Sequence, residues 1–381
     1  MNAPKLRFKE FKDEWKKEKF SQFSYNSGKR NKDSLNLVPY AITNTFGFVP
    51  QNEAHSEFGY MKNTDRKAYN IVTKNSFAYN PARINVGSIG YYSNNDDIIV
   101  SSLYEVFKTR NYIDDKFIWY WLKSDKFPKW INKLQEGSVR QYFYYDKLCE
   151  TPVYLPSLNE QTKIANTLEL LDKKIELQTK RIEDLKLFKL YTKNKIFNDY
   201  DEVFKLKDIL VKWNKKNKNN SVKYVESISN KYGFISQSDQ FEDRNVASKN
   251  LNNYYIIEKG VFGYNPSRLN VGSLALKTND KISVVSPLYE CFTTSQNNQY
   301  LLEWFDSKYF RKETISKFEG GVRNTLNFSN LCEIEIRLPI IEKQNKYSNI
   351  FRMFNNKIEL EVKKLYKLQE LKKGLMQNMF V

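Results

Sequence analysis

One long internal repeat restricts the fold of this chain more than any other feature of the sequence. Residues 77–90 read FAYNPARINVGSIG, and residues 262–275 read FGYNPSRLNVGSLA. At an offset of 185, 16 of the 31 residues from Phe77 to Phe107 are identical to their counterparts, and an offset of 183 aligns residues 136–197 with 319–380 without a gap. The chain of 381 residues is therefore a tandem duplication, and its unit is far too long for a solenoid repeat.

The first part of each copy, residues 1–157 and 200–340, has the pattern of a mixed α and β domain. Short apolar and β-branched runs such as IVTKNSFAYN and YYIIEKGVFGYN alternate with Gly, Asn and Pro, which predicts strands and turns. FIWYWLKSDKFPKWINKLQ and YLLEWFDSKYFRKETISKF have the apolar spacing of amphipathic helices.

The second part of each copy, residues 158–199 and 341–381, is predicted to be a long helix. Pro156 precedes a stretch from Asn159 to Asn198 that lacks Gly and Pro, and Gly374 interrupts only the last turns of the second copy. Spacings of three and four place apolar residues on a heptad seam; these are Ile164, Leu168, Leu171, Ile175, Ile182, Leu185, and Tyr347, Phe351, Phe354, Ile358, Leu365, Leu368.

The expected fold class is α+β, with two pseudo-symmetric mixed domains joined by two long antiparallel coiled-coil helices. Gln178 and Glu361 occupy corresponding seam positions, since 178 + 183 = 361, and each falls near the middle of its helix. In an antiparallel pair the midpoints meet at the pseudo-two-fold axis. We therefore predict that these two side chains form a buried polar pair that favours one register.

The charge of the chain favours a polyanionic partner. Lys and Arg exceed Asp and Glu by 62 − 44 = 18, which suits nucleic acid first. Two related domains about a pseudo-two-fold axis match the symmetry of duplex DNA, on which two-fold readers contact two half-sites. Because the copies have diverged, the two half-sites should differ in sequence.

The repeated motif YNPxRxNVGS supplies the first candidate contact residues. Arg pairs with guanine, Asn pairs with adenine, and Ser contacts phosphate or base. The alternative is a purely structural strand–turn–strand, with Asn80-Pro81 setting the turn. The candidates are Arg83, Asn85 and Ser88 in the first copy, and Arg268, Asn270 and Ser273 in the second.

A second shared motif reads GSVRQYFYYDKL in the first copy and GGVRNTLNFSNL in the second. A common Arg is followed by an amide and then by divergent residues, which is the pattern expected of a reading loop with interchangeable specificity. A helix–strand connection is the alternative. The candidates are Arg140, Gln141 and Tyr142, and Arg323 and Asn324.

The sequence lacks the common signatures of an enzyme. It contains no GxGxxG and no GxxxxGK[ST], and Asn80-Pro81-Ala82 and Asn265-Pro266-Ser267 miss the second proline of an amino-methyltransferase motif. His55 is the single histidine, so a multi-His metal site is excluded. Three cysteines without metal spacing, and no long apolar segment, predict a cytoplasmic protein.

Together these features resemble the specificity subunit of type I restriction-modification systems, over essentially the whole chain. The resemblance rests on LRFKEF near the start, on LPSLNEQTKIANTLELLDKKIELQ and on LPIIEKQNKYSNIFRMFNNKIELEVKKLYKLQELKKGLMQNMF. A proline, then Gln161 or Gln344, then the long helix is the specific combination; Lys343 departs from the usual Glu-Gln pair.

The resemblance implies two target-recognition domains that read a bipartite, asymmetric site in double-stranded DNA. It implies docking to two modification (methyltransferase) subunits, which bring S-adenosylmethionine, and to restriction (endonuclease/translocase) subunits, which bring ATP. The chain itself would bind no cofactor and no metal and would not be catalytic. A coiled-coil adaptor with two binding heads and no DNA remains the alternative, and it would bind with little salt dependence.

Overall fold

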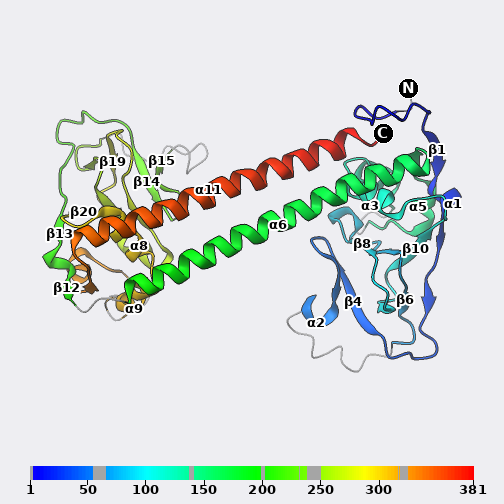
Figure 1. The fold of residues 1–381 in the computed structure, drawn as a ribbon, viewed down its shortest axis with the longest axis horizontal. Coiled ribbons are helices and arrows are strands. Elements are labelled where there is room, and N and C mark those ends of the chain that lie inside the picture. The colour runs from blue at the N-terminus through cyan, green and yellow to red at the C-terminus, as the bar shows by residue number, and fades with distance from the viewer. Residues whose placement is uncertain are drawn as a thin grey trace. The chain divides into compact units, whose positions relative to one another are not determined.

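The computed structural model describes residues 3–54, 66–136, 141–198, 202–230, 232–237, 250–315, 317 and 325–381. The chain divides into two compact units, of which the first comprises Met1–Thr179 with Lys363–Val381 and the second Lys180–Val362. Each unit therefore contains one mixed α and β domain and one half of each long helix, α6 (Leu158–Phe197) and α11 (Ile341–Asn378) (Figure 1). The predicted fold class is confirmed.

The domain of the first unit is built on two sheets. The first has the strand order β2-β10-β7-β8 and is antiparallel; the second has the order β3-β6-β9-β4-β5, in which only β4 and β9 pair in parallel. Their strands are β2 (Ser24–Asn26), β10 (Glu105–Thr109), β7 (Ser76–Tyr79), β8 (Ile89–Tyr92), β3 (Lys29–Arg30), β6 (Asn70–Val72), β9 (Ile98–Val100), β4 (Val38–Thr43) and β5 (Gly47–Pro50). A separate ribbon joins β1 (Lys16–Lys19) to β11 (Pro152–Leu155).

Helices cover the first sheet and enclose an aromatic core. Asp114 begins the helix α3 because its carboxylate accepts a hydrogen bond from the amide of Phe117 at 3.0 Å. The amphipathic run predicted here divides into two helices, with Pro128 in the first turn of the second, where proline is tolerated. The helices of this domain are α1 (Phe20–Phe23), α3 (Asp115–Lys123), α4 (Phe127–Leu134) and α5 (Tyr145–Glu150), together with α2 (Gln51–Ala54), which contacts β4 and β5 of the second sheet.

The second unit repeats this arrangement. The order β13-β20-β17-β18 corresponds to β2-β10-β7-β8, and β12 pairs with β21 as β1 does with β11. The strands are β12 (Val203–Lys205), β13 (Leu210–Lys212), β14 (Glu226–Ser229), β15 (Gly233–Ser236), β16 (Tyr255–Ile257), β17 (Phe262–Tyr264), β18 (Leu274–Leu276), β19 (Ser283–Val285), β20 (Glu290–Thr294) and β21 (Glu335–Arg337). The helices are α8 (Asn298–Phe305), α9 (Lys308–Ile315) and α10 (Phe328–Cys332).

The two long helices run antiparallel within each unit (Figure 1). In the first unit Asp172 of α6 forms an ion pair with Lys372 of α11, and in the second unit the rings of Phe188 and Phe354 lie 5.5 Å apart. All twelve predicted seam residues are buried or half-buried. Gly374 does not end the second helix, which continues to Asn378. No helix within the described ranges is long and apolar enough to cross a membrane.

The end of each long helix enters a hydrophobic core. In the first unit Met379 and Phe380 are buried, and the amide of Leu6 donates to the carbonyl of Asn378 at 2.9 Å, which brings the two termini together (Figure 1). In the second unit Ile196 and Phe197 take the same part. The core of each unit is therefore completed by a helix end.

Candidate nucleic-acid interface

The repeated YNPxRxNVGS motif folds into the same loop in both units. In the first unit the amide of Asn80 donates to the carbonyl of Ser88 at 3.1 Å, and the amide of Arg83 donates to the carbonyl of Asn80 at 3.0 Å. Gly87 closes the loop at φ +89°, a conformation that favours glycine. The second unit repeats these bonds at 3.1 and 3.0 Å and this conformation at +87°, through Asn265, Ser273, Arg268 and Gly272.

The structural role that the sequence left open for this motif is therefore supported, yet two of its side chains are available for contact. Arg83 and Asn85 are exposed. Ser88 is buried, and its hydroxyl donates to the carbonyl of Ile42 at 2.9 Å, which fixes the loop on the β4–β5 hairpin. In the second unit Arg268 is exposed and Ser273 is buried.

The second motif packs against the first one. The amide of Phe143 donates to the carbonyl of Pro81 at 3.1 Å, and in the second unit the amide of Leu326 donates to Pro266 at the same distance. Backbone hydrogen bonds of 2.9 and 2.7 Å join Glu136 to Tyr142 at the start of the described part of this motif. Two stretches about 60 residues apart in sequence thus form one surface.

In the first unit this surface is hollowed into a groove of about 470 Å³. The predicted residues Arg83 and Tyr142 both line it. The ring of Tyr142 stacks on that of Tyr144, with centroids 5.5 Å apart and an angle of 4° between the planes. The groove is further lined by Asn26, Arg30, Asn70, Asn80, Leu103 and Glu105. Arginines, amides and an exposed aromatic face are the groups that contact phosphates, base edges and bases.

Glu105 is the one acidic residue lining this groove among the described residues. Burial raises the pKa of its carboxyl above the ordinary value. Its negative charge opposes a polyanion in the groove, and protonation removes that charge.

Two pairs of exposed apolar residues that are equivalent between the copies were not predicted, and one of them, Leu103, lines the groove. Phe46 and Tyr232 are equivalent residues at the turns of the β4–β5 and β14–β15 hairpins, and Leu103 and Leu288 are equivalent in the repeated SxLYExF. All four side chains are at least 66% exposed. The signal in the sequence was the conservation of a large apolar residue between the copies at positions outside any strand pattern.

Part of the predicted contact set cannot be placed. Arg140, Arg323 and Asn324 lie outside the described residues, as does His55, and of Asn270 only the backbone is described, in the 3₁₀ helix η4 (Pro266–Val271). Gln141 is described and exposed. For Arg140, Gln141, Asn270, Arg323 and Asn324 a contact with DNA stays a prediction. In the described part of the chain no three His, Cys, Asp or Glu are placed to hold a metal.

Glu361, one member of the predicted seam pair, is fully buried. Its carboxylate oxygen lies 3.7 Å from the guanidinium of Arg181 and 3.2 Å from the ammonium of Lys357, both within the second unit. Gln178 is half-buried and belongs to the first unit. A direct contact between Gln178 and Glu361 stays a prediction.

The glutamine that begins each long helix has a definite structural role. The side-chain oxygen of Gln161 accepts from the amide of Asp114 at 2.9 Å, and its nitrogen donates to the carbonyl of Pro156 at 3.0 Å. Gln344 makes the same two bonds, to Asn297 at 3.1 Å and to Pro339 at 2.8 Å, and its nitrogen also donates to the side-chain oxygen of Gln296 at 2.8 Å. These bonds join the start of each long helix to the first turn of a helix of its domain and so position the domain on α6 or α11.

Comparison with known proteins points in one direction. Residues 8–187 match the family model described as the type I restriction modification DNA specificity domain. The type I restriction enzyme MjaVIII specificity subunit of Methanocaldococcus jannaschii is 33% identical over 93 residues, which cover 24% of this chain and 21% of that protein. The match thus spans about a fifth of the curated relative.

Two solved structures share the fold over nearly the whole chain. One is the S subunit of a type I restriction-modification system from M. genitalium, with a TM-score of 0.59 and 15% identity, covering 100% of this chain and 99% of that one. The other comes from work on complex assembly and conformational transition of the type I R-M system, with a TM-score of 0.56 and 13% identity, covering 96% and 97%.

Proposed function

Since residues 8–187 belong to the family of type I restriction-modification DNA specificity domains, we propose that the whole chain is the DNA-recognition subunit of such a complex. It reads a bipartite, asymmetric site in double-stranded DNA. The observation that carries this proposal is the groove of the first unit, in which two separate repeated motifs bring Arg83 beside the stacked rings of Tyr142 and Tyr144.

The chemistry of the groove fits a DNA segment. Exposed guanidinium groups contact phosphates or guanine edges, and side-chain amides contact adenine. The apolar residues at the hairpin turns and in the SxLY segments are of the type that wedges between base pairs. These positions are equivalent in both units, so each unit contacts its own half-site in the same orientation.

The two half-sites differ because the units differ where their loops meet the groove. Tyr142, Tyr144 and Tyr145 of the first copy correspond to Thr325, Asn327 and Phe328 of the second. The backbone bond from this segment to the motif loop is the same in both units. A shared frame that holds different side chains reads two different sequences.

Exposed apolar residues of the long helices support the docking of two modification subunits. Leu170 and Leu177 of α6 are seven residues apart, nearly two helical turns, and therefore share one face. Met353 and Leu360 are their equivalents on α11. Phe188 and Leu371 form a third equivalent pair, and all six side chains are more than half exposed. Because each unit carries the same set, two copies of one partner are accommodated.

The chain itself performs no chemistry in this proposal. Methyl transfer belongs to the modification subunits, which bring S-adenosylmethionine, and cleavage belongs to the restriction subunits, which bring ATP. The support is the family to which residues 8–187 belong and the absence of nucleotide fingerprints from the sequence.

Methylome sequencing of a host that expresses the chain with its modification subunit tests the proposal. We expect adenine methylation at one bipartite site and none with the chain alone. Arg83→Ala should weaken recognition of one half-site by about 1–3 kcal/mol, and Arg268→Ala that of the other. Lys129→Ala on α4 removes an exposed charge outside the groove and is the control.

Two outcomes would contradict the proposal. Methyl transfer by the purified chain would show that it is an enzyme. Binding of the assembled complex that barely changes with salt would favour the adaptor without DNA, since a DNA reader loses affinity steeply as salt rises.

A further inference from the structure

The ends of the two long helices are homologous, yet each enters a different unit. Phe197 and Phe380 are equivalent, since 197 + 183 = 380, as are Phe117 and Tyr300. The ring of Phe380 lies 5.3 Å from that of Phe117 in the first unit, and the ring of Phe197 lies 5.3 Å from that of Tyr300 in the second. The aromatic contacts are so similar that they give little reason for either unit to prefer one end.

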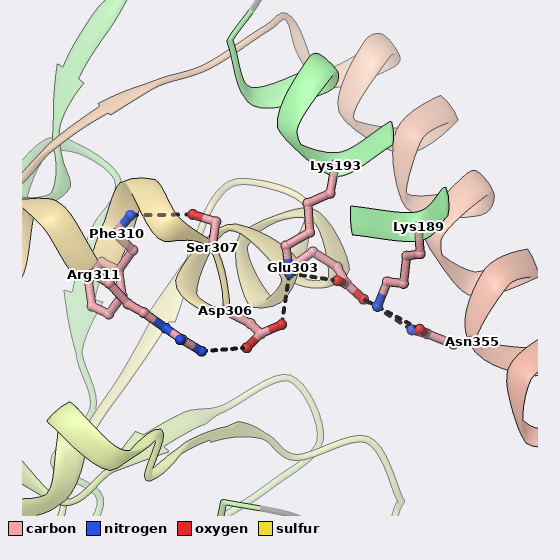
Figure 2. A network of polar contacts seen from close by, with 8 residues as sticks. All are labelled: Lys189, Lys193, Glu303, Asp306, Ser307, Phe310, Arg311 and Asn355. Carbon is pink, nitrogen blue, oxygen red and sulfur yellow. Dashed lines mark hydrogen bonds and ion pairs between the residues drawn. The ribbon is translucent and has the colours of Figure 1, made fainter. Parts of the chain in front are cut away.

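Polar groups beside these rings do differ, and the second unit has a buried charged cluster there. The ammonium of Lys189 lies 2.8 Å from a carboxylate oxygen of Glu303 and 2.7 Å from the amide oxygen of Asn355 (Figure 2). Lys193 lies 3.3 Å from the other oxygen of Glu303 and 2.8 Å from Asp306. The side chains of Lys193 and Glu303 are 5% and 6% exposed. Two lysines of the α6 end thus meet two acids of α8 and its C-terminal boundary.

The equivalent place in the first unit carries another charge pattern. Tyr120 stands where Glu303 stands, Asp172 replaces Asn355, and Lys123 replaces Asp306. The hydroxyl of Tyr120 donates to Asp172 at 2.8 Å, and Lys372, the equivalent of Lys189, forms an ion pair with Asp172. Met376 replaces Lys193 and shares a cavity of about 580 Å³ with Lys123 and Lys372.

We propose that these charges are a pairing code, which fixes the end of α6 in the second unit and the end of α11 in the first. Its discriminating position is 193 in one helix and 376 in the other. A consequence is that the two halves of the chain, residues up to 198 and from 202, pair with each other and not each with a second copy of itself. This inference is independent of the proposed function.

The α6 end is disfavoured in the first unit because its second lysine would lie beside Lys123, and both acids that line this cavity, Asp125 and Asp172, already have a cation nearby. Lys193 in the place of Met376 would meet Tyr120 and Lys123. Asp172 is already engaged by Lys372 and Tyr120, and the nearby Asp125 lies 3.8 Å from Lys129. Partial burial and then Lys372 lower the pKa of Lys123, so this ammonium already disfavours another positive charge.

The α11 end is disfavoured in the second unit because it has only Lys372 to pair with the two acids Glu303 and Asp306. Met376 in the place of Lys193 would leave one oxygen of the buried Glu303 without its cation. Asp306 would keep only Arg311 among its cations described here, at 3.6 Å. Removing one partner of a buried ion pair is strongly unfavourable, because the remaining charge keeps its desolvation cost.

A nicked chain tests the code directly. A protease site is inserted between Asn198 and Glu202, the folded chain is cut, and its halves are allowed to exchange in mild denaturant and refold. Native mass spectrometry then separates the mixed pair from the two like pairs. We expect the wild type to exceed random pairing in favour of the mixed pair by roughly tenfold or more. Lys193→Met with Met376→Lys makes each like pair match a native unit and makes the mixed pair mismatched, so this variant should favour the like pairs.

Random pairing of the wild-type halves would overturn the proposal, and so would a persistent mixed pair in the double variant. The intact chain gives a second measurement that needs no exchange. Met376→Lys should lower the unfolding midpoint of the first unit, and adding Lys123→Ala should restore part of the loss. Met376→Gln removes apolar contact without adding charge, so Lys123→Ala should not rescue it. Equal effects of Lys123→Ala in both backgrounds would also refute the code.

Discussion

Replacing Gln161 by Ala should loosen the first unit from the start of its long helix. The side chain is 2% exposed and makes two bonds, accepting from the amide of Asp114 and donating to the carbonyl of Pro156. Its removal leaves a donor and an acceptor unsatisfied in a place that is largely closed to water. Each such group costs about 1–3 kcal/mol, and partial access of water at Asp114 places the total at about 2–4 kcal/mol.

This loss is large enough to resolve in a melting experiment. For a unit of this size 1 kcal/mol corresponds to roughly 2–4 °C, so the midpoint of the first unit should fall by roughly 5–15 °C. Hydrogen exchange of the Asp114 amide should accelerate in the same variant. Gln344→Ala should destabilise the second unit at least as much, because its side chain bonds to Asn297, Pro339 and also Gln296.

Two further variants separate the hydrogen bonds from other effects. Asn159→Ala removes an exposed side chain two residues away and should leave both midpoints unchanged. Gln161→Glu keeps the bond from Asp114 but faces the carbonyl of Pro156 with a carboxylate, so it should not restore stability at neutral pH. The reasoning would be refuted by a Gln161→Ala variant within about 0.5 kcal/mol of wild type, the range of an ordinary surface substitution.

Three other predictions concern the groove, a buried ion pair and the helices. Burial raises the pKa of the Glu105 carboxyl, so acidification from neutral pH should protonate it earlier than an ordinary glutamate and tighten DNA binding, as measured by fluorescence anisotropy. Glu105→Gln should bind more tightly at neutral pH and lose this pH dependence. Lys277→Met should leave the buried Glu226 with Ser283 as its recorded partner and cost the second unit about 3–5 kcal/mol in chemical denaturation, and Glu226→Gln in addition should recover part of the loss. If the long helices set the distance between the half-sites, four residues inserted into α6 should lengthen it by ~6 Å. Since base pairs stack at ~3.4 Å, methylome sequencing should then show a spacer longer by one or two base pairs. An active variant with an unaltered spacer would contradict this role of the helices.

The architecture could be predicted because periodicity and repetition are properties of the sequence itself. A heptad seam without Gly or Pro predicts a long helix wherever it docks, and both helices begin within one residue of the predicted start. The repeat shows that there are two related domains without any knowledge of their topology. By contrast, the docking of Phe380 in the first unit depends on the shape of a core that no local pattern describes.

Residues of the candidate site could be predicted only where a polar or aromatic side chain stands in a motif that both copies share. Arg83 and Tyr142 were singled out as polar or aromatic residues in shared motifs, and both line the groove. Arg30 and Glu105 also line it, but they are brought there by the pairing of β3 with β6 and of β10 with β7, which single-sequence patterns do not reveal. Ser88 was predicted as a contact, and its burial instead favours the structural role that had been the alternative.

One departure from the family pattern also has a physical explanation. Glu160 precedes Gln161 and is 1% exposed, because Arg7 holds both of its carboxylate oxygens at 2.7 and 2.8 Å. At the equivalent position of the second copy the side chain of Lys343 is exposed and carries the opposite charge. The Glu-Gln pair thus combines a glutamine that joins helix to domain in both units with a glutamate that anchors the N-terminal segment in the first unit.

Comparison of the two copies distinguishes structural features that both units need from side chains that differ between the units. The YNPxRxNVGS loop, its bond to the second motif and the glutamine at the helix start recur almost unchanged, because each fixes a backbone path that both domains require. Differences include two kinds of position: side chains that face the groove, and the charged groups that surround the helix ends. In the proposed function the first kind would allow the two halves of a DNA site to differ, and in the proposed code the second would allow two homologous helix ends to be told apart. A chain that repeats its frame but not its charges would in this way read an asymmetric site with a nearly symmetric fold.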